Sequence, residues 1–441
     1  MALSIALQFV VVLAAIWIGA RYSGVGLGLW GAVGLLVLIV VFGITPTSPP
    51  IDVMLIILAV IMAASVMDAA GGINFLVRIA ERIIRANPKY VTIVAPLTTW
   101  CFTFVAGTGH IIYPLLPVIY ETAYQSGIRP ERPMAVATIA SQQAITASPV
   151  AAATAAMIGL FAEKGLSQWG LPQILLICVP ASLTGVIVAA IISMFIGKDL
   201  KDDPEYQARL AAGKIPPPKA TDESSPLKPV AKLSAYLFLT GVSLVVLFGF
   251  FPEFRTLPGA EEPLAMPIMI EVVMLAFAAI MLMFTKVNVD DVPKTATLRA
   301  GVVAVIGIFG LAWLGDSFIA SHRDVIVPAI GRWAEAAPWT FAFGLFFASV
   351  LLYSQAATTR ALVPLGIALA IPPQFLIAMF PSVNGYFFIP TYGSLIAAIN
   401  FDHSGTTKIG KYVLNHSFMI PGLVATSVAV VVGLILAHIM F

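Results

Sequence analysis

Polar side chains gather at four interruptions of otherwise apolar stretches. The interruptions are Gly107-Thr108-Gly109, Ser148-Pro149, Ser354-Gln355 and Ile389-Pro390-Thr391. A hydroxyl side chain beside a glycine turn or before a proline favours the start of a helix. The first turn of a helix has free N–H groups and about half a positive charge, so it binds carboxylates without a lysine buried in lipid. Four such starts, in two pairs, predict a site for a dianion with two carboxylates.

Further polar residues lie in the same stretches. Each is a candidate ligand of the dianion, although a single Ser or Thr in a membrane helix commonly bonds its own backbone. The candidate substrate-binding residues are Thr108, Gly109, Ser141, Gln142, Thr146, Ser148, Ser354, Gln355, Thr358, Arg360, Asn384 and Thr391.

Arg360 is the only Arg or Lys between residues 341 and 400. A buried arginine at membrane depth suggests a carboxylate clamp, and packing or snorkelling of its long side chain is the alternative.

Two residues are candidates for ion coupling. His110 can carry a coupling proton or make a structural hydrogen bond, and Asp402 follows the last interruption, in a loop suited to gating.

The residue types exclude several other classes of function. The sequence has no His/Glu/Asp metal cluster, no GxSxG motif and no aspartate pair in its apolar stretches, so we expect no enzyme, no metal and no cofactor. Cys101 and Cys178 lie inside apolar stretches and indicate neither a disulfide framework nor a zinc site. The net charge of +2 does not indicate a nucleic-acid partner.

The composition places these polar groups in a membrane. The 441 residues are 59% hydrophobic and 10% charged, with a mean hydropathy of +0.97, whereas soluble domains carry about 25% charged residues. The chain therefore needs the lipid bilayer as its solvent. The chain begins with an apolar stretch that no Lys or Arg precedes, so we expect a retained membrane helix rather than a signal peptide.

The hydrophobic pattern predicts an all-α polytopic membrane protein. A bilayer core of about 30 Å takes roughly 20 apolar residues per helix. The stretches 89–125 and 338–371 are split into halves too short to span, and we expect re-entrant hairpins there. The stretches 133–162 and 374–400 are predicted to be broken transmembrane helices. The remaining spans are predicted at 4–20, 25–44, 51–70, 172–196, 232–251, 266–285, 300–320 and 413–440.

The two halves of the chain repeat this order of elements. Residues 1–196 and 232–441 each contain three helices, a hairpin, a broken helix and a final helix. Gly107 and Ser354, at the two hairpin tips, are each followed by a proline at the same spacing. Inverted repeats with broken helices are typical of secondary transporters, and a chance alignment of glycines and prolines is the alternative.

The basic residues orient the repeats across the membrane. The loops 197–232 and 286–299 are basic, which predicts the cytoplasmic side, whereas 252–265 carries more acidic than basic residues and is predicted outside. Both termini then lie outside and the two repeats are inverted, although the two arginines of the outer loop 321–337 go against the rule. The Pro- and charge-rich segment 197–231 lacks a hydrophobic period and is predicted to be a flexible cytoplasmic linker.

A set of short stretches occurs in a fixed order along the chain. The stretches are Arg85-Ala86-Asn87-Pro88-Lys89-Tyr90, Gly107-Thr108-Gly109, Arg129-Pro130-Glu131-Arg132-Pro133, Ile145-Thr146-Ala147-Ser148-Pro149, Ser354-Gln355-Ala356-Ala357, Ile389-Pro390-Thr391-Tyr392 and Ser404-Gly405-Thr406-Thr407. In this order they resemble the anaerobic C4-dicarboxylate transporter (Dcu) family of bacteria, of the DcuA/DcuB type and closest to the DcuA branch, over nearly the whole chain. One departure is that Gly393 and Ser394 follow Tyr392, where a proline is expected.

The resemblance implies exchange of fumarate, malate or aspartate against succinate, and uptake with protons, across the inner membrane of bacteria respiring anaerobically, which would make both termini periplasmic. The plan of hairpins and broken helices also resembles the wider ion transporter superfamily, which implies an elevator motion by analogy of fold. A channel, or a transporter of another small organic anion, is the alternative that the same breaks allow. A homo-oligomer, and a sensor kinase that contacts the loops 197–231 or 401–412, stay open as partners.

Overall fold

The computed structural model describes residues 2–22, 25–49, 51–215, 227–260, 262–322, 324–325, 337–352, 354–390, 392–410 and 414–441. The predicted site residue Thr391 and both arginines of the loop 321–337 lie outside these ranges. Within them the chain is helical, with one isolated antiparallel bridge between Ile409 and His416. The prediction of an all-α protein is confirmed for this part of the chain.

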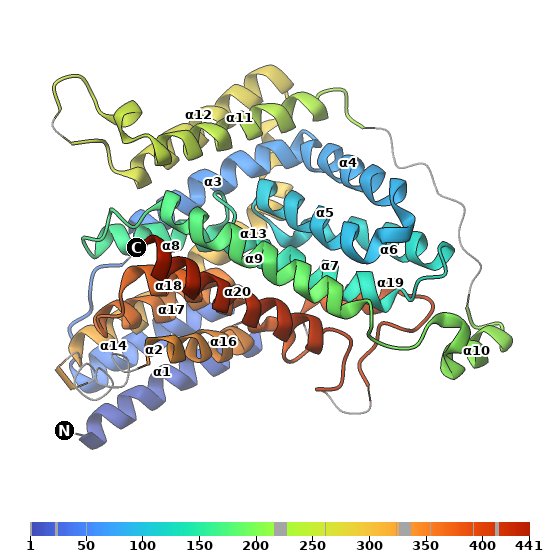
Figure 1. Cartoon of the computed structure of the whole chain (residues 1–441). Coiled ribbons are helices and arrows are strands. Elements are labelled where there is room, and N and C mark those ends of the chain that lie inside the picture. The colour runs from blue at the N-terminus through green and yellow to red at the C-terminus, as the bar shows by residue number, and fades with distance from the viewer. Residues whose placement is uncertain are drawn as a thin grey trace.

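Figure 1 shows helices stacked side by side, most of them running between two ends of the molecule. One end carries α10 (Pro204–Ala211), and both chain termini lie toward the other. We call these the linker end and the terminal end. The other α-helices are α1 Ala2–Tyr22, α2 Gly26–Phe42, α3 Ile51–Ala69, α4 Gly72–Ala86, α5 Val91–Ala106, α6 Ile112–Gln125, α7 Glu131–Gln143, α8 Ala152–Glu163, α9 Leu171–Ser193, α11 Ala231–Phe250, α12 Met266–Thr285, α13 Ala296–Gly307, α14 Trp313–Ser321, α16 Phe341–Leu352, α17 Gln355–Ala368, α18 Pro373–Met379, α19 Gly393–Phe401 and α20 Met419–Met440.

By length and composition, 6 helices among the described residues can cross a bilayer. They are α9, α11, α12, α20, the run Ala296–Ser321 and the first hairpin limb with its leading turn, Pro88–Ala106. A seventh span results if α3 and α4, which meet at 73°, count as one broken helix. The first limb is longer than the sequence indicated, because the 3-10 turn Pro88–Tyr90 extends it to 19 residues. The prediction of a polytopic membrane protein is confirmed.

α4 is a helix that the hydropathy pattern did not predict, because it is too polar for a membrane span. It is amphipathic: Leu76, Ala80 and Ile84 are buried, whereas Arg82 is exposed. The helix packs on α5 and α6 and also on α11. It therefore connects the first hairpin to the second half of the chain.

Each stretch that was predicted to be a re-entrant hairpin folds as two helices joined at a turn, and re-entrance stays a prediction. α5 ends at Gly107, whose φ of +69° is the left-handed conformation that glycine adopts most readily. The hydroxyl of Thr108 caps the turn that follows, and the hydroxyl of Ser354 caps α17 in the second hairpin. In Figure 1 the first hairpin opens toward the linker end and the second toward the terminal end.

Both predicted broken helices are interrupted, but their second parts start later than expected. α8 begins at Ala152 and not at Pro149. Ser148 does not cap it, because it lies before the N-cap residue, Ala151. Its hydroxyl donates to the carbonyl of Phe104 at 2.6 Å and accepts from the N–H of Val150 at 3.4 Å. α19 likewise begins at Gly393, after a long 3-10 segment, and not at Pro390.

The two halves of the chain pack on each other in matched pairs. α9 and α20 lie together along the middle of the molecule (Figure 1). The second limb of each hairpin packs on the second part of the opposite broken helix, α6 on α19 and α17 on α8. In the same way α12 packs on α3, and α2 packs on the π-helical turn between α13 and α14.

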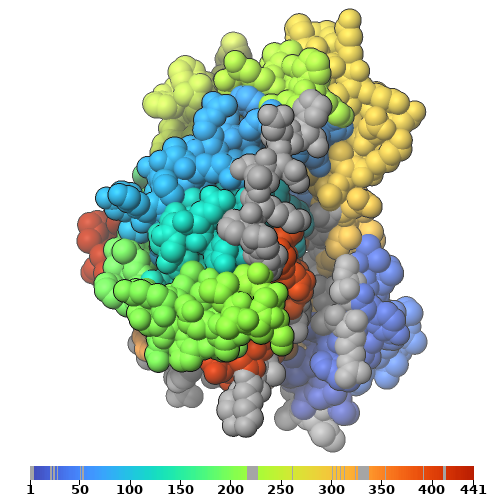
Figure 2. Space-filling model, turned by 90° about the vertical axis from the view of Figure 1, so that its right-hand side faces the viewer, coloured from blue at the N-terminus to red at the C-terminus, as the bar shows by residue number. Residues whose placement is uncertain are grey.

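The described part of the linker, residues 197–215, is folded, which corrects the prediction of a flexible tether. Asp203 caps α10 by accepting from the backbone N–H groups of Glu205 and Tyr206, at 2.9 and 3.2 Å. The ring of Tyr206 is buried. Figure 2 looks onto this end and shows α10 against the orange-red C-terminal segment, where the Lys408 ammonium pairs with Glu205.

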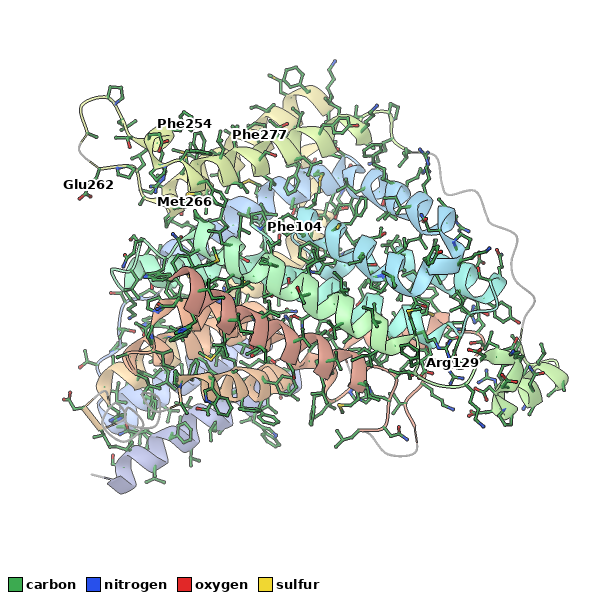
Figure 3. The ribbon with its side chains drawn as sticks, viewed as in Figure 1. Phe104, Arg129, Phe254, Glu262, Met266 and Phe277 are labelled. Atoms are coloured by element: carbon green, nitrogen blue, oxygen red, sulfur yellow. The ribbon has the colours of Figure 1, made fainter. Side chains whose placement is uncertain are left out.

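The loop between α11 and α12 lies at the opposite end from α10. Figure 3 places Phe254 and Glu262 of this loop at the terminal end and Arg129 at the linker end. The segment predicted outside and the segment predicted in the cytoplasm therefore lie at opposite ends of the molecule.

A candidate substrate site where the helix breaks meet

One cavity lies where both hairpin tips and both broken helices meet, and we call it the central cavity. Its volume is about 150 Å³, which is the liquid volume of roughly five water molecules, so it suits a small solute. No Asp, Glu, Lys or Arg is among the described residues that line it. The lining residues are Gly107, Thr108, Gly109, His110, Tyr113, Gln142, Ile145, Ala152, Ala153, Ser354, Gln355, Ala356 and Tyr392.

Four helices begin at the wall of the central cavity. The turn that leads into α6 begins at Gly109, α8 begins at Ala152, and α17 begins at Gln355. Tyr392 is the N-cap residue of α19. Two of the four starts differ from the prediction, because α8 and α19 begin at Ala152 and Gly393 and not at Pro149 and Pro390. The free N–H groups of the four starts supply positive potential without a cationic side chain.

Two of these helix starts are capped by a hydroxyl side chain. Thr108 Oγ1 accepts from the backbone N–H of His110 at 3.3 Å, and Ser354 Oγ accepts from that of Ala357 at 3.2 Å. Each cap occupies one N–H group of the first turn. The remaining N–H groups of the turn stay available to a ligand.

Side-chain amides from both halves form a hydrogen-bonded chain beside the central cavity. Gln355 Nε2 donates to Gln142 Oε1 at 2.9 Å and to Asn384 Oδ1 at 3.1 Å. Asn384 Nδ2 donates to Gln143 Oε1 at 3.2 Å, and Gln143 Nε2 donates to Thr426 Oγ1 at 2.7 Å. All of these side chains are buried. Buried networks of this kind hold their members in fixed positions, so the amides of Gln142 and Gln355 are fixed at the cavity wall.

Gly109 allows the first hairpin tip to approach this network. A Cβ atom at position 109 would lie 2.4 Å from Gln142 Nε2, closer than a carbon and a nitrogen atom come without a bond. The absence of a side chain at Gly109 therefore allows the tip of the first hairpin to pack directly against Gln142.

Two tyrosines of the central cavity are site residues that the sequence did not predict. The Tyr113 ring stacks on His110 with 5.9 Å between centroids, and the Tyr392 ring packs on Tyr386 at 4.8 Å. Tyr113 lies three residues after His110, on the same helical face, and this spacing is a signal that could have identified it. Tyr392 directly follows the last interruption, which is a comparable signal.

Several predicted hydroxyl residues do not line the central cavity. Ser141, Thr146 and Thr358 each donate to a backbone carbonyl three or four residues earlier, at 2.7, 3.0 and 2.8 Å. This is the local bonding that the sequence left as the alternative. The predicted residues that do line the cavity are Thr108, Gly109, Gln142, Ser354 and Gln355, and Asn384 joins them through Gln355.

Arg360 and Asp402 also lie away from the central cavity. Arg360 is buried and borders a different cavity, so the predicted clamp does not share a site with the four helix starts. The Asp402 carboxylate accepts from the backbone and hydroxyl of Ser404, from the hydroxyl of Thr406 at 2.8 Å and from the N–H of Thr407 at 2.6 Å. A carboxylate with this many partners anchors the loop that follows α19.

Two relatives match this chain over 98% of its length. Residues 4–441 match the family described as anaerobic C4-dicarboxylate membrane transporter. The chain is 42% identical over 434 residues to the C4-dicarboxylate transporter DcuA of Wolinella succinogenes, covering 98% of this chain and 99% of the relative. It is 38% identical over 437 residues to the anaerobic C4-dicarboxylate transporter DcuB of Escherichia coli O6:H1, covering 98% of each chain.

The fold is similar to that of a solved transporter. The crystal structure of the Alcanivorax borkumensis YdaH transporter matches with a TM-score of 0.56 at 13% identity, covering 93% of this chain and 89% of that one. The family match over residues 4–441 and the sequence relatives show that the chain belongs to the DcuA/DcuB family of anaerobic C4-dicarboxylate membrane transporters.

Proposed function

We propose that this protein carries four-carbon dicarboxylates, such as fumarate, succinate, malate and aspartate, by exchange or together with protons. One observation carries the proposal: four helix N-termini and two amide side chains meet at a small cavity whose described lining has no Asp, Glu, Lys or Arg. N–H groups and helix dipoles compensate the two carboxylates of the substrate. The empty site leaves no charge uncompensated in the membrane, so it can also move without cargo.

Access to the central cavity alternates, in this proposal, between two inverted repeats formed by residues 1–196 and 232–441. The opposite openings of the two hairpins and the matched packing of α6 on α19 and α17 on α8 support the repeats. The hairpins are proposed to be re-entrant, with their tips at mid-membrane. A site at the interface of such repeats is exposed to one side at a time when one group of helices moves as an elevator against the other.

The protein is proposed to lie in the bacterial inner membrane with the linker end in the cytoplasm and both termini in the periplasm. The described linker carries Lys198, Lys201, Arg209 and Lys214, which favours the cytoplasm. The loop at the terminal end between α11 and α12 has the opposite balance of charge.

His110 is the residue that we propose for a coupling proton, because it lines the central cavity beside Thr108. A proton on its imidazole would reduce the net charge of the loaded site. Coupling through Asp402 stays a prediction, and its many hydrogen bonds support an anchoring role instead.

Counterflow in proteoliposomes tests the proposed function. Vesicles loaded with unlabelled succinate should accumulate labelled succinate or fumarate transiently, and internal malate and aspartate should replace internal succinate. Internal glutarate, with five carbons, and internal butyrate, a monocarboxylate, should stimulate uptake of the labelled dicarboxylate far less. Neither places two carboxylates at the four-carbon spacing. A channel gives no stimulation from the opposite side, and that outcome would refute exchange.

A further inference from the structure

Arg360 is a buried cation without a partner in the described part of the chain. It lies in α17, and only 2% of its surface is exposed. None of its three guanidinium nitrogens has a hydrogen-bond partner among the described residues. Burial of a guanidinium is costly unless an acceptor, above all an anion, pairs with it. The side chain therefore requires an anionic partner that these residues do not supply.

Arg360 borders a cavity at the terminal end of the molecule, which we call the outer cavity. Its volume is about 480 Å³, and it shares no lining residue with the central cavity. In Figure 1, the end of α8 and helix α14, which both contribute to it, lie toward the terminal end. The other lining residues are Thr47, Ser48, Pro49, Ile51, Leu160, Glu163, Lys164, Asp316 and Pro364.

The acidic residues of the outer cavity do not hydrogen-bond Arg360. Lys164 Nζ lies 3.5 Å from Asp316 Oδ1, and these two side chains are 38% and 29% exposed. Glu163, next to Lys164, is also exposed. Water screens these exposed charges, whereas Arg360 is buried.

We propose that the outer cavity is a second carboxylate-binding site, where Arg360 pairs with a carboxylate of the dicarboxylate before the substrate reaches the central cavity. A guanidinium matches the two oxygens of a carboxylate with two parallel hydrogen bonds. Arg360 lies five residues after Gln355 on α17, which is about 7.5 Å along the helix axis. One helix thus borders both sites. The inference rests on the proposed function, because it takes the transported dicarboxylate as its ligand.

Protection of a cysteine by succinate tests the outer site. Cys101→Ser removes the exposed native cysteine, and Ser48→Cys reports access to the outer cavity from an exposed lining position. Right-side-out vesicles with this protein are treated with an impermeant maleimide at increasing succinate. We expect succinate to slow the labelling. The concentration for half-protection should rise about ten- to hundred-fold in Arg360→Gln, which loses a charge-assisted hydrogen-bonded pair.

Two further variants identify the source of the protection. Gln142→Ala weakens the central site and does not alter the lining of the outer cavity. Succinate should therefore still protect Ser48→Cys at the concentration found without this substitution. Asp316→Asn removes an acidic residue of the outer cavity and should leave protection equal or stronger. The proposal is overturned if Gln142→Ala abolishes protection as Arg360→Gln does, because protection then originates at the central site. It is equally overturned if Asp316→Asn abolishes protection, because Arg360 then serves as an ion-pair partner of Asp316.

Counterflow in the same vesicles separates this test from the test of the proposed function. A protein that exchanges succinate without protection of Ser48→Cys contradicts the outer site alone, and a protein that shows neither contradicts both proposals. If Arg360→Gln does not reach the membrane, Arg360→Lys decides the question. Lysine keeps the positive charge but cannot make two parallel hydrogen bonds to a carboxylate. We therefore expect the succinate concentration for half-protection to rise roughly threefold or more, and an unchanged concentration contradicts the proposal.

Discussion

The side chain of Gln142 joins the two halves of the chain at the central cavity. Its Oε1 accepts from Gln355 Nε2 at 2.9 Å, and the residue lines the cavity. Gln142→Ala removes this acceptor and leaves a buried amide with one partner fewer, a loss of about 1–3 kcal/mol. We expect the counterflow KM for succinate to rise about tenfold. Gln142→Glu should raise it further, because a carboxylate there repels the dianion.

Ser141 provides the matched control for Gln142. It precedes Gln142 on α7 and is as deeply buried, but its hydroxyl bonds the carbonyl of Thr138. Ser141→Ala removes this backbone bond and a long 3.5 Å contact from Gln142 Nε2, but it keeps the bond between Gln142 Oε1 and Gln355. It should therefore change the KM by no more than about twofold. Equal effects of the two substitutions would mean that the assay reports the integrity of α7 and not contact with the substrate.

Residue roles were predictable from the sequence where they depend on the neighbouring chain. Thr108 and Ser354 were recognised as helix starts from their neighbouring residues, whereas Ser148 was expected to cap α8 and does not. Thr426 was not recognised, because its partner Gln143 lies 283 residues away and no local feature marks it. Arg360 was recognised as a buried cation, but its cavity depends on which helices surround α17, which the sequence does not show.

The first hairpin turns at Gly107, and this turn sets the position of its tip. The residue has φ +69°, and a Cβ atom there would lie 2.7 Å from the carbonyl oxygen of Val150. Gly107→Ala should therefore strain the backbone and push the tip away from the break before α8. We expect the rate of counterflow to fall more than about tenfold, with a loss of stability of roughly 1–3 kcal/mol. Counterflow rates and thermal unfolding in detergent measure both effects.

Gly127 separates backbone strain from the clash at Val150. It has φ +70°, and nothing lies within 4 Å of a Cβ atom there. Gly127→Ala should lose about 1–2 kcal/mol of stability from the left-handed conformation alone and keep its transport rate. If Gly127→Ala slows transport as much as Gly107→Ala does, the position of the tip is not the cause.

α10 is held at the linker end by a charged cluster around Arg129. The guanidinium donates to Asp203 and Glu131, and also to the carbonyl of Lys198 at 3.2 Å. Asp203→Asn removes the charge from one of these bonds and should weaken docking by roughly 1.5–3 kcal/mol. Hydrogen exchange at residues 204–211 should accelerate accordingly. Asp202→Asn, at an exposed position in the preceding turn, should leave the exchange unchanged.

The docking of α10 should also depend on pH. Burial by itself would raise the pKa of Asp203, but hydrogen bonds from Arg129 and from the backbone of Tyr206 and Glu205, with the charge of Arg129, lower it below its usual value. The docked form then binds fewer protons, so docking is fully stable above the unfolded pKa of about 3.9. It weakens as the pH falls through the lower, docked-state pKa. Hydrogen exchange at α10 should accelerate only in this acidic range. In Asp203→Asn, which lacks the titrating carboxyl, it should not show this pH dependence.

Elements were predictable where glycine, proline or a long apolar run marks them. The hairpin turns at Gly107 and Ser354 follow from their own residues. α4 and α10 were missed because hydropathy detects spans and not short amphipathic helices, even though Asp203 and Pro204 form a standard helix start. The start of α8 was placed too early because Ser148 bonds the carbonyl of Phe104 on another helix. A tertiary contact there overrides the local preference of Ser-Pro.

Each half of the molecule covers part of the other half. α12 packs on α3, and α2 packs on the turn between α13 and α14, so the peripheral helices of each half lie on the other half. The central cavity is likewise completed by both halves, through Gln142 from one and Gln355 from the other. In the proposed alternating access, movement of the site would therefore involve both halves at once.

Labelling of single cysteines tests the proposed orientation of the whole molecule. Lys214 precedes the end of the described linker, and Pro258 lies in the loop between α11 and α12; both are exposed. In the Cys101→Ser background, Lys214→Cys should react with an impermeant maleimide only from the cytoplasmic side and Pro258→Cys only from the periplasmic side. Ser4→Cys, at an exposed position near the start of α1, should react from the same side as Pro258→Cys.

The three positions together discriminate between arrangements of the repeats. If positions 214 and 258 react from the same side, α11 does not cross the membrane and the inverted repeats are refuted. If position 4 reacts from the same side as position 214, the number of crossings before the linker is even, whereas the proposed first repeat requires an odd number. The outer cavity lies at the terminal end with Asp316 and Lys164 at its mouth. Periplasmic reaction of position 258 would place this cavity at the periplasmic end, as the proposed outer site requires.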